Sequence, residues 1–147
     1  MTMRPVLTLG MLALAAVPLA AQHTVDANAT VGVYVPASEI AAAIAKLPKD
    51  PLASVPILKI GPYNVNIEHR LGPPTAPQTA SVHDKEAELF YIMDGTATLV
   101  TGGKKVGGQQ TGDNWRGPSV EGGTAQKMSK GDFMLVPAGV PHWFTNI

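Results

Sequence analysis

The chain has 147 residues, with 11 basic and 11 acidic side chains and no cysteine. The balanced charge gives no electrostatic basis for binding nucleic acid or an anionic membrane. The lack of cysteine excludes disulfides, thiol catalysis and thiolate metal sites, so any metal ligands are nitrogen or oxygen atoms.

The first 21 residues have the pattern of a secretory signal peptide. Arg4 gives a positive start, an apolar run covers residues 6–19, and two alanines follow. This pattern predicts a signal peptide over residues 1–21, cleavage before Gln22, and a periplasmic or secreted protein without a membrane segment. The alternative is an uncleaved membrane anchor, although the run is short for a span. The rest of the chain is long enough for one domain with a core.

Residues 22–55 are predicted to form an N-terminal arm and one helix. The helix is expected between Pro36 and Pro48, with Ser38 as its N-cap. Its apolar residues recur at helical spacing: Ile40, Ala43, Ile44 and Leu47. This stripe is interpreted as packing against the domain, and contact with a second copy is the alternative. His23, in the arm, is interpreted as a solvated residue and not as a ligand.

Residues 56–147 are predicted to form the main domain, because the apolar pattern changes to a period of two. In residues 63–71, His69 shares one strand face with valine, isoleucine and leucine. It is interpreted either as a buried core histidine or as a pocket residue. Another strand is expected over residues 96–101. Residues 102–123 hold eight glycines and are expected to form a long flexible connection with a hairpin near its centre.

Two short stretches each combine strand, turn and a histidine at the head of a strand. The first carries His83 and then Glu88, and the second carries His142 after a Pro-Ala-Gly-Val-Pro turn. Two histidines and one carboxylate from separate strands can converge on a single divalent metal ion. The sequence therefore predicts one metal site built from these stretches.

Together, the two stretches resemble the paired motifs of the cupin superfamily. The second is complete: Gly131, five residues, Pro137, one, Gly139, two, His142, three, Asn146. The first keeps His83, four residues, Glu88, six, Gly95, but Ser81 stands where the family usually has its first histidine. The resemblance implies an all-β fold, the double-stranded β-helix or cupin jelly-roll barrel, with one short N-terminal helix.

The resemblance also implies that His83, Glu88 and His142 bind one divalent metal ion inside the barrel. With Ser81 in place of a histidine, three protein ligands remain. Two histidines and a carboxylate with open positions suit Fe(II) or Mn(II), with Zn, Ni or Co as alternatives. Two hypotheses address the missing ligand: Ser81 orients a bound water, or His69 is a replacement ligand. A vestigial site without metal is the remaining alternative.

The pocket beside this site is expected to be small and mostly apolar, because ligands and apolar side chains alternate onto the same strand faces. Candidate pocket or rim residues are Phe90, Tyr91, Trp115, Arg116 and Phe144. We expect an exported, metal-dependent enzyme for a small organic molecule, with dioxygenase or oxygenase chemistry ahead of isomerase or lyase chemistry. The alternative is a non-catalytic module that binds or senses a small ligand.

A homodimer is implied by the resemblance, with the barrel edge and residues 37–47 as expected contacts. One further strand is also expected to complete the sheet. Either the N-terminal strands or residues beyond Ile147 would supply it.

Overall fold

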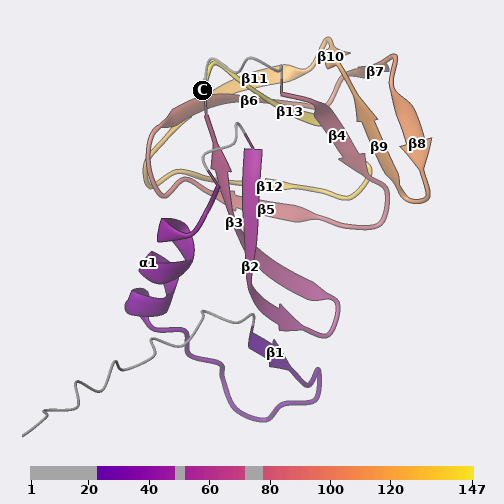
Figure 1. Ribbon diagram of the computed structural model, residues 1–147. Coiled ribbons are helices and arrows are strands. Elements are labelled where there is room, and N and C mark those ends of the chain that lie inside the picture. Colours follow the sequence, from indigo (N-terminus) through magenta and orange to yellow (C-terminus); the bar gives the residue numbers. More distant parts are fainter. Residues whose placement is uncertain (1–22, 49–51, 72–77) are drawn as a thin grey trace, which may run out of the picture. The chain divides into compact units, whose positions relative to one another are not determined.

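The computed structural model describes residues 23–48, 52–71 and 78–147 (Figure 1). The predicted signal peptide lies outside these residues. Within them, no helix has the length and apolar character needed to cross a membrane. The described residues divide into two compact units, one drawing on 23–46 and 56–66 and the other on 47–48, 52–55, 67–71 and 78–147.

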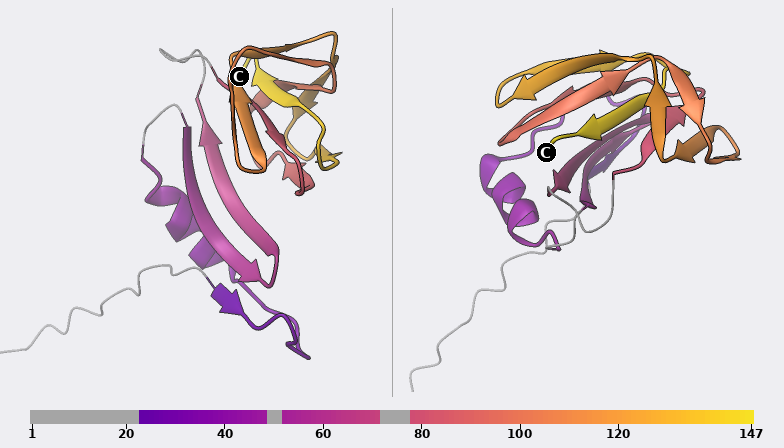
Figure 2. Two further views of the ribbon diagram at one scale, coloured as in Figure 1. Left: turned by 90° about the vertical axis from the view of Figure 1, so that its right-hand side faces the viewer. Right: turned by 90° about the horizontal axis from the view of Figure 1, so that it is seen from above.

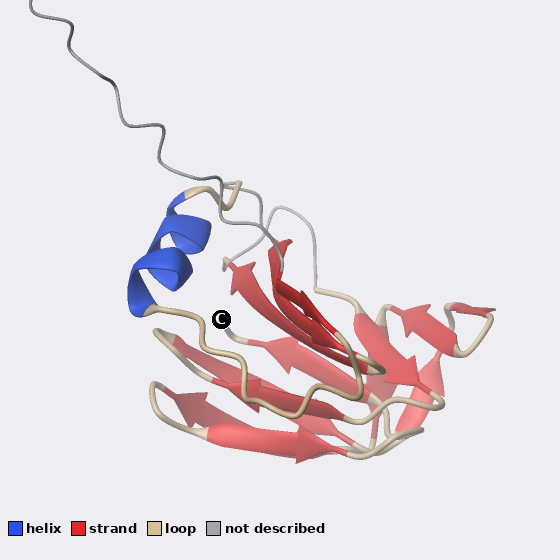
Figure 3. Ribbon diagram, turned by 90° about the horizontal axis from the view of Figure 1, so that it is seen from below, coloured by secondary structure: helices blue, strands red, loops and turns tan. Residues whose placement is uncertain are grey.

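The first unit contains the described part of the N-terminal arm. Strand β1 (His23–Val25) pairs in parallel with β2 (Leu52–Ile60), and the sheet order is β1-β2-β3, with β3 spanning Tyr63–Arg70. Helix α1 (Ala37–Ala45) is the helix drawn in blue in Figure 3. The Nε2 atom of His23 lies 2.7 Å from Glu39 Oε2, so this histidine ties the arm to the first turn of α1.

Helix α1 begins at a proline, and the prediction that Ser38 is its N-cap is wrong. Pro36 is extended, with φ −69° and ψ 149°, and no side chain caps the helix. The Pro36 carbonyl instead accepts hydrogen bonds from the backbone of Glu39 at 3.0 Å and Ile40 at 3.3 Å. The fixed φ of proline defines this boundary without a side-chain cap, which leaves Ser38 inside the first turn.

The second unit is built from short strands. Most of them form a six-stranded sheet in the order β11-β6-β13-β4-β9-β8, and Figure 2 shows β11, β6 and β13 running alongside one another. Strands β5 and β12 form a separate pair, as do β7 and β10. The bounds are β4 Ala80–His83, β5 Glu88–Tyr91, β6 Thr96–Thr101, β7 Lys104–Val106, β8 Gln109–Thr111, β9 Asn114–Gly117, β10 Ser119–Glu121, β11 Thr124–Ser129, β12 Phe133–Val136 and β13 His142–Thr145.

This organisation confirms the predicted all-β fold with one short helix. Strand β13 joins the two motif stretches, because it pairs with β6 on one side and with β4 on the other. His142 lies directly opposite Ser81 in this register. Among the described residues the strands form separate sheets and not a closed barrel.

The glycine-rich segment 102–123 is ordered, so the expectation of a long flexible connection is wrong. It forms β7, β8, β9 and β10. Its glycines permit close backbone crossings: a Cβ atom on Gly103 would lie 2.3 Å from Glu121 O, and one on Gly108 would lie 2.3 Å from Arg116 O. Both glycines also have positive φ, of 83° and 78°. Here glycine allows strands to approach and turn tightly, which is a structural role.

Two apolar clusters lie in the second unit. The first gathers Ala97, Leu99, Met128, Val136 and Phe144, with Phe90 packed against it. The second gathers Ala80, Val82, Trp115 and Val120. Strand β4 separates them, since Val82 contributes to the second cluster while Ser81 and His83 point to the opposite face.

The outer face of the β5–β12 pair is apolar and exposed. Tyr91 is directly opposite Phe133, and Leu89 is directly opposite Leu135. Their exposed fractions run from 61% to 71%. We call these four residues the β5–β12 patch.

Candidate metal centre

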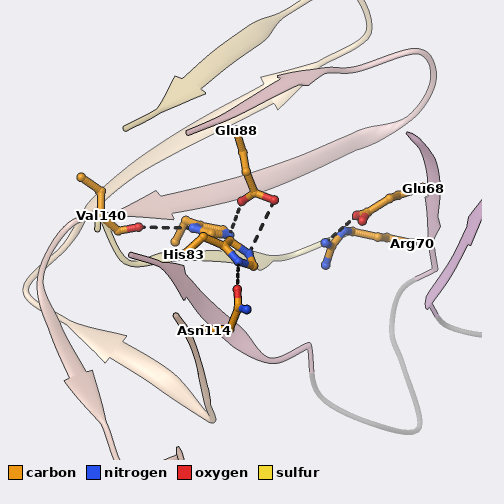
Figure 4. A network of polar contacts seen from close by, with 7 residues as sticks. Glu68, Arg70, His83, Glu88, Asn114 and Val140 are labelled. Carbon is orange, nitrogen blue, oxygen red and sulfur yellow. Dashed lines mark hydrogen bonds and ion pairs between the residues drawn. The ribbon is translucent and has the colours of Figure 1, made fainter. Parts of the chain in front are cut away.

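Three potential ligands reach one point from three strands. His83 ends β4, Glu88 begins β5 and His142 begins β13, and one donor atom from each lies within 4.8 Å of the others. The Nε2 atom of His142 is 2.9 Å from Glu88 Oε2, and the Nε2 atom of His83 is 3.6 Å from Glu88 Oε1 (Figure 4). The three side chains predicted from the motifs are therefore brought together.

The turn of the second motif is fixed to the backbone of the first. Gly139 has a φ of 76° and donates its N–H to the carbonyl oxygen of His83 at 2.8 Å. Pro141 accepts a hydrogen bond from the Gly102 N–H at 2.8 Å, immediately before His142. Backbone hydrogen bonds thus hold two of the ligand residues in register.

Each histidine ring is oriented by an oxygen acceptor at Nδ1. His83 Nδ1 contacts Asn114 Oδ1, and His142 Nδ1 lies 3.3 Å from the Val140 carbonyl oxygen (Figure 4). These acceptors assign the proton of each neutral ring to Nδ1, which leaves the Nε2 lone pair facing Glu88. Asn114 comes from β9, where it is directly opposite His83. This acceptor was missed in the sequence because it lies in the segment expected to be flexible.

The carboxylate of Glu88 makes ion pairs with both histidines of the cluster. Burial raises the pKa of Glu88, but the neighbouring His142, His83 and Arg70 outweigh it and lower the pKa below its ordinary value. The buried Oε2 atom nevertheless has no partner with hydrogen-bond geometry, despite the 2.9 Å approach of His142 Nε2.

The donor set fits a divalent metal ion. Nitrogen and oxygen ligands lie about 2.0–2.2 Å from such an ion, so two of them are at most about 4.4 Å apart. The separations of 2.9 Å and 3.6 Å are inside this limit. The carboxylate oxygen without a partner is also the kind of atom that a bound cation would satisfy.

The sequence matches the model of a known protein family. A family model described as Cupin matches residues 69–147, which is more than half of the chain. The chain belongs to the cupin family. The match includes both motif stretches and every ligand in the cluster. Comparisons with curated proteins and with solved structures gave no match.

The two residues considered for the missing cupin histidine differ in their relation to the cluster. Ser81 is buried and shares the His142 side of the sheet, because the two are directly opposite on neighbouring strands. His69 is not brought to the three donors among the described residues. Its neighbour Arg70 contacts Phe144, and strand alternation directs His69 to the other face of β3. The replacement-ligand hypothesis for His69 gains no support.

The candidate pocket residues divide into two groups. Phe90 and Phe144 line the cluster: their rings are 5.1 Å apart, and the Phe90 ring is 5.8 Å from the His142 ring. Tyr91 lies in the exposed β5–β12 patch, on the opposite face from Glu88. Trp115 is buried in the second apolar cluster and donates to the Gly107 carbonyl at 3.2 Å.

Arg116 lies nearer to the site, because it is directly opposite Ser81 in register, although its side chain is exposed. Arg70, which the sequence analysis did not name, also affects the site, because its positive charge lowers the pKa of Glu88. Arg70, the last residue of β3, stacks on Phe144 with its Cζ atom 4.7 Å from the ring centroid. Arg70 follows His69 directly in the sequence. The prediction considered His69 because it lies on the apolar face of β3, and Arg70 lies on the opposite face.

Proposed function

We propose that this cupin is a metal-dependent enzyme that acts on a small organic molecule. Its ligands would be His83, Glu88 and His142. The observation that carries the proposal is the Glu88 carboxylate, whose buried Oε2 atom faces an imidazole nitrogen 2.9 Å away without a hydrogen bond. A buried carboxylate oxygen without a hydrogen bond is costly, and a divalent cation held by all three side chains would offset that cost.

A divalent ion in this donor set would polarise a substrate oxygen or activate O2. Fe(II) or Mn(II) is favoured because two nitrogens and one carboxylate leave open coordination positions, and Zn, Ni and Co are the alternatives. The protein's own contribution is to hold the rings through Asn114 and the Val140 carbonyl. Phe90 and Phe144 exclude water on one side of the site. Dioxygenase or oxygenase chemistry is the first assignment, ahead of isomerase or lyase chemistry.

A second candidate function is a binding or sensing module without turnover. It is favoured by Ser81, because the residue opposite His142 is a weak ligand where cupins usually have a histidine. A metal site with three protein ligands can also hold a small molecule without transforming it. Turnover that follows metal occupancy would exclude this alternative.

We also propose that the protein is exported and acts in the periplasm or outside the cell, with residues 1–21 as its signal. The support is the sequence pattern alone. Fractionation of the expressing cells followed by N-terminal sequencing tests this, with Gln22 expected as the first residue of the exported form. A protein that keeps Met1 and remains in the cytoplasm would contradict it.

The decisive experiment is elemental analysis of protein purified without a metal-chelating column. The parent is expected to hold close to one ion per chain, and His83→Ala and His142→Ala are expected to lose it. Ser81→Ala and His69→Ala are the matched variants, and both should retain the ion. Ser81→His should retain it more strongly, because it adds a ring opposite His142. Undiminished metal content in the His142 variant would refute the proposal.

A further inference from the structure

Arg70 extends the site beyond its three donors. Its side chain is largely buried, with 22% exposed, and its guanidinium stacks on the Phe144 ring. Phe144 contacts Phe90, whose ring lies beside His142. Side-chain contacts therefore run without a break from the guanidinium through Phe144 and Phe90 to His142. Figure 4 shows the guanidinium directed toward the side on which His83 and Glu88 meet.

The guanidinium is held in place by two side chains. Its Nη1 donates to Gln78 Oε1 at 3.0 Å and its Nη2 donates to Glu68 Oε2 at 2.7 Å. A guanidinium has five N–H groups, so within the described residues these two bonds leave donors for a ligand. Glu68 is more exposed than Arg70, at 38% against 22%, and it stands at the outer side of the pair.

We propose that Arg70 binds the carboxylate of a small organic acid whose apolar part lies along the partly buried Phe90. This inference rests on the proposed function, because it names the substrate class of the same site. A planar guanidinium pairs with a carboxylate through two parallel hydrogen bonds. The carboxylates of Glu68 and Glu88 disfavour a doubly charged anion beside a single arginine. A singly charged acid with an apolar body avoids this repulsion and can still pack against the aromatic ring.

The test uses benzoate and its neutral counterpart benzamide as probes, with calorimetric titration of the full-length protein in metal-free and Zn(II)-loaded forms. Benzoate should bind more tightly than benzamide. Arg70→Gln should weaken benzoate binding roughly ten- to a hundredfold, the range expected for a charge-assisted contact. Benzamide binding should change little. Lys130→Gln removes one exposed positive charge elsewhere in the same unit and should have no effect.

Glu68→Gln provides a test that misfolding cannot imitate. It removes the negative charge that competes for Arg70, so benzoate should bind more tightly than it does to the parent. Unchanged benzoate affinity in Arg70→Gln would overturn the inference, as would no benzoate binding to the parent or an equal loss in Arg116→Gln. Arg70-dependent binding in a protein that takes up no metal would sustain this inference and refute the proposed function. A protein that takes up metal but binds benzoate equally well in Arg70→Gln would sustain the proposed function and refute this inference.

Discussion

Asn114 gives the sharpest test of how the cluster is held. It lies on β9 directly opposite His83, and its Oδ1 atom accepts from His83 Nδ1. Without this acceptor, the His83 ring can rotate and can carry its proton on Nε2, the atom needed for the metal. Loss of such an outer acceptor typically lowers metal affinity about ten- to a hundredfold.

The position of Asn114 sets the expected magnitude within that range. Its side chain is exposed, so water can replace part of the lost hydrogen bond in Asn114→Ala. We therefore expect a loss of about tenfold, near the lower end. Asn114→Asp keeps the acceptor and adds a negative charge, so it should bind metal at least as well as the parent.

The assay is competition for Zn(II) against a chromogenic chelator, with Gln110→Ala as the matched control. Gln110 is a neighbouring exposed amide that bonds to Asp84 and to the Gly112 carbonyl and not to a ligand residue. Its variant should bind zinc like the parent. Equal affinity in Asn114→Ala and the parent would refute the positioning role, as would an Asn114→Asp variant that loses as much as the alanine variant.

Three further outcomes are expected. Because the pKa of Glu88 is lowered in the fold, its contribution to the stability of the metal-free protein is present above the ordinary value of 4.5 and is lost as the pH falls through the lowered pKa. Denaturant melts of Glu88→Gln against pH should lack this acid-side loss, and an identical slope in both proteins would contradict it. Trp115→Ala should lower the free energy of unfolding by about 3–5 kcal/mol, because the side chain is buried in the second apolar cluster. Its zinc affinity should be kept, and a large affinity loss in the folded variant would return Trp115 to the site. We propose that the protein is a homodimer in which a second copy covers the β5–β12 patch. The four side chains of the patch expose roughly 500 Å². This is more than half of the area of about 800 Å² that each partner buries in a stable interface. Sedimentation should show a dimer that Leu89→Ser with Phe133→Ser converts to monomer, and a monomeric parent at high concentration would refute the assignment.

The three metal donors could be predicted from the sequence because each motif that carries them lies within one short stretch of the chain. His83 with Glu88, and the Pro-Ala-Gly-Val-Pro turn before His142, are each contained within one strand–turn–strand stretch. Strand alternation also placed Phe90 on the Glu88 face correctly. The fold class followed from the same motifs.

The supporting residues could not be predicted because they depend on long-range register. Asn114 meets His83 only through the pairing of β4 with β9, across a segment whose glycines indicated flexibility. Arg70 reaches Phe144 from the polar face of β3, whereas of this strand the sequence analysis considered only His69, on the apolar face, as a pocket residue. Trp115 appeared to be a pocket residue by position in the chain, and its pairing with Val82 places it in the other cluster.

The place of β13 in its sheet has a consequence for folding. This strand follows every other strand of the six-stranded sheet in the sequence, yet it lies in the middle, between β6 and β4. The pairs β6–β11 and β4–β9 can form early, but they stay disconnected until β13 enters between them. Such long-range closure slows folding. His142 therefore reaches His83 and Glu88 in the same event that unites the sheet, so the ligand set is incomplete until β13 is in place.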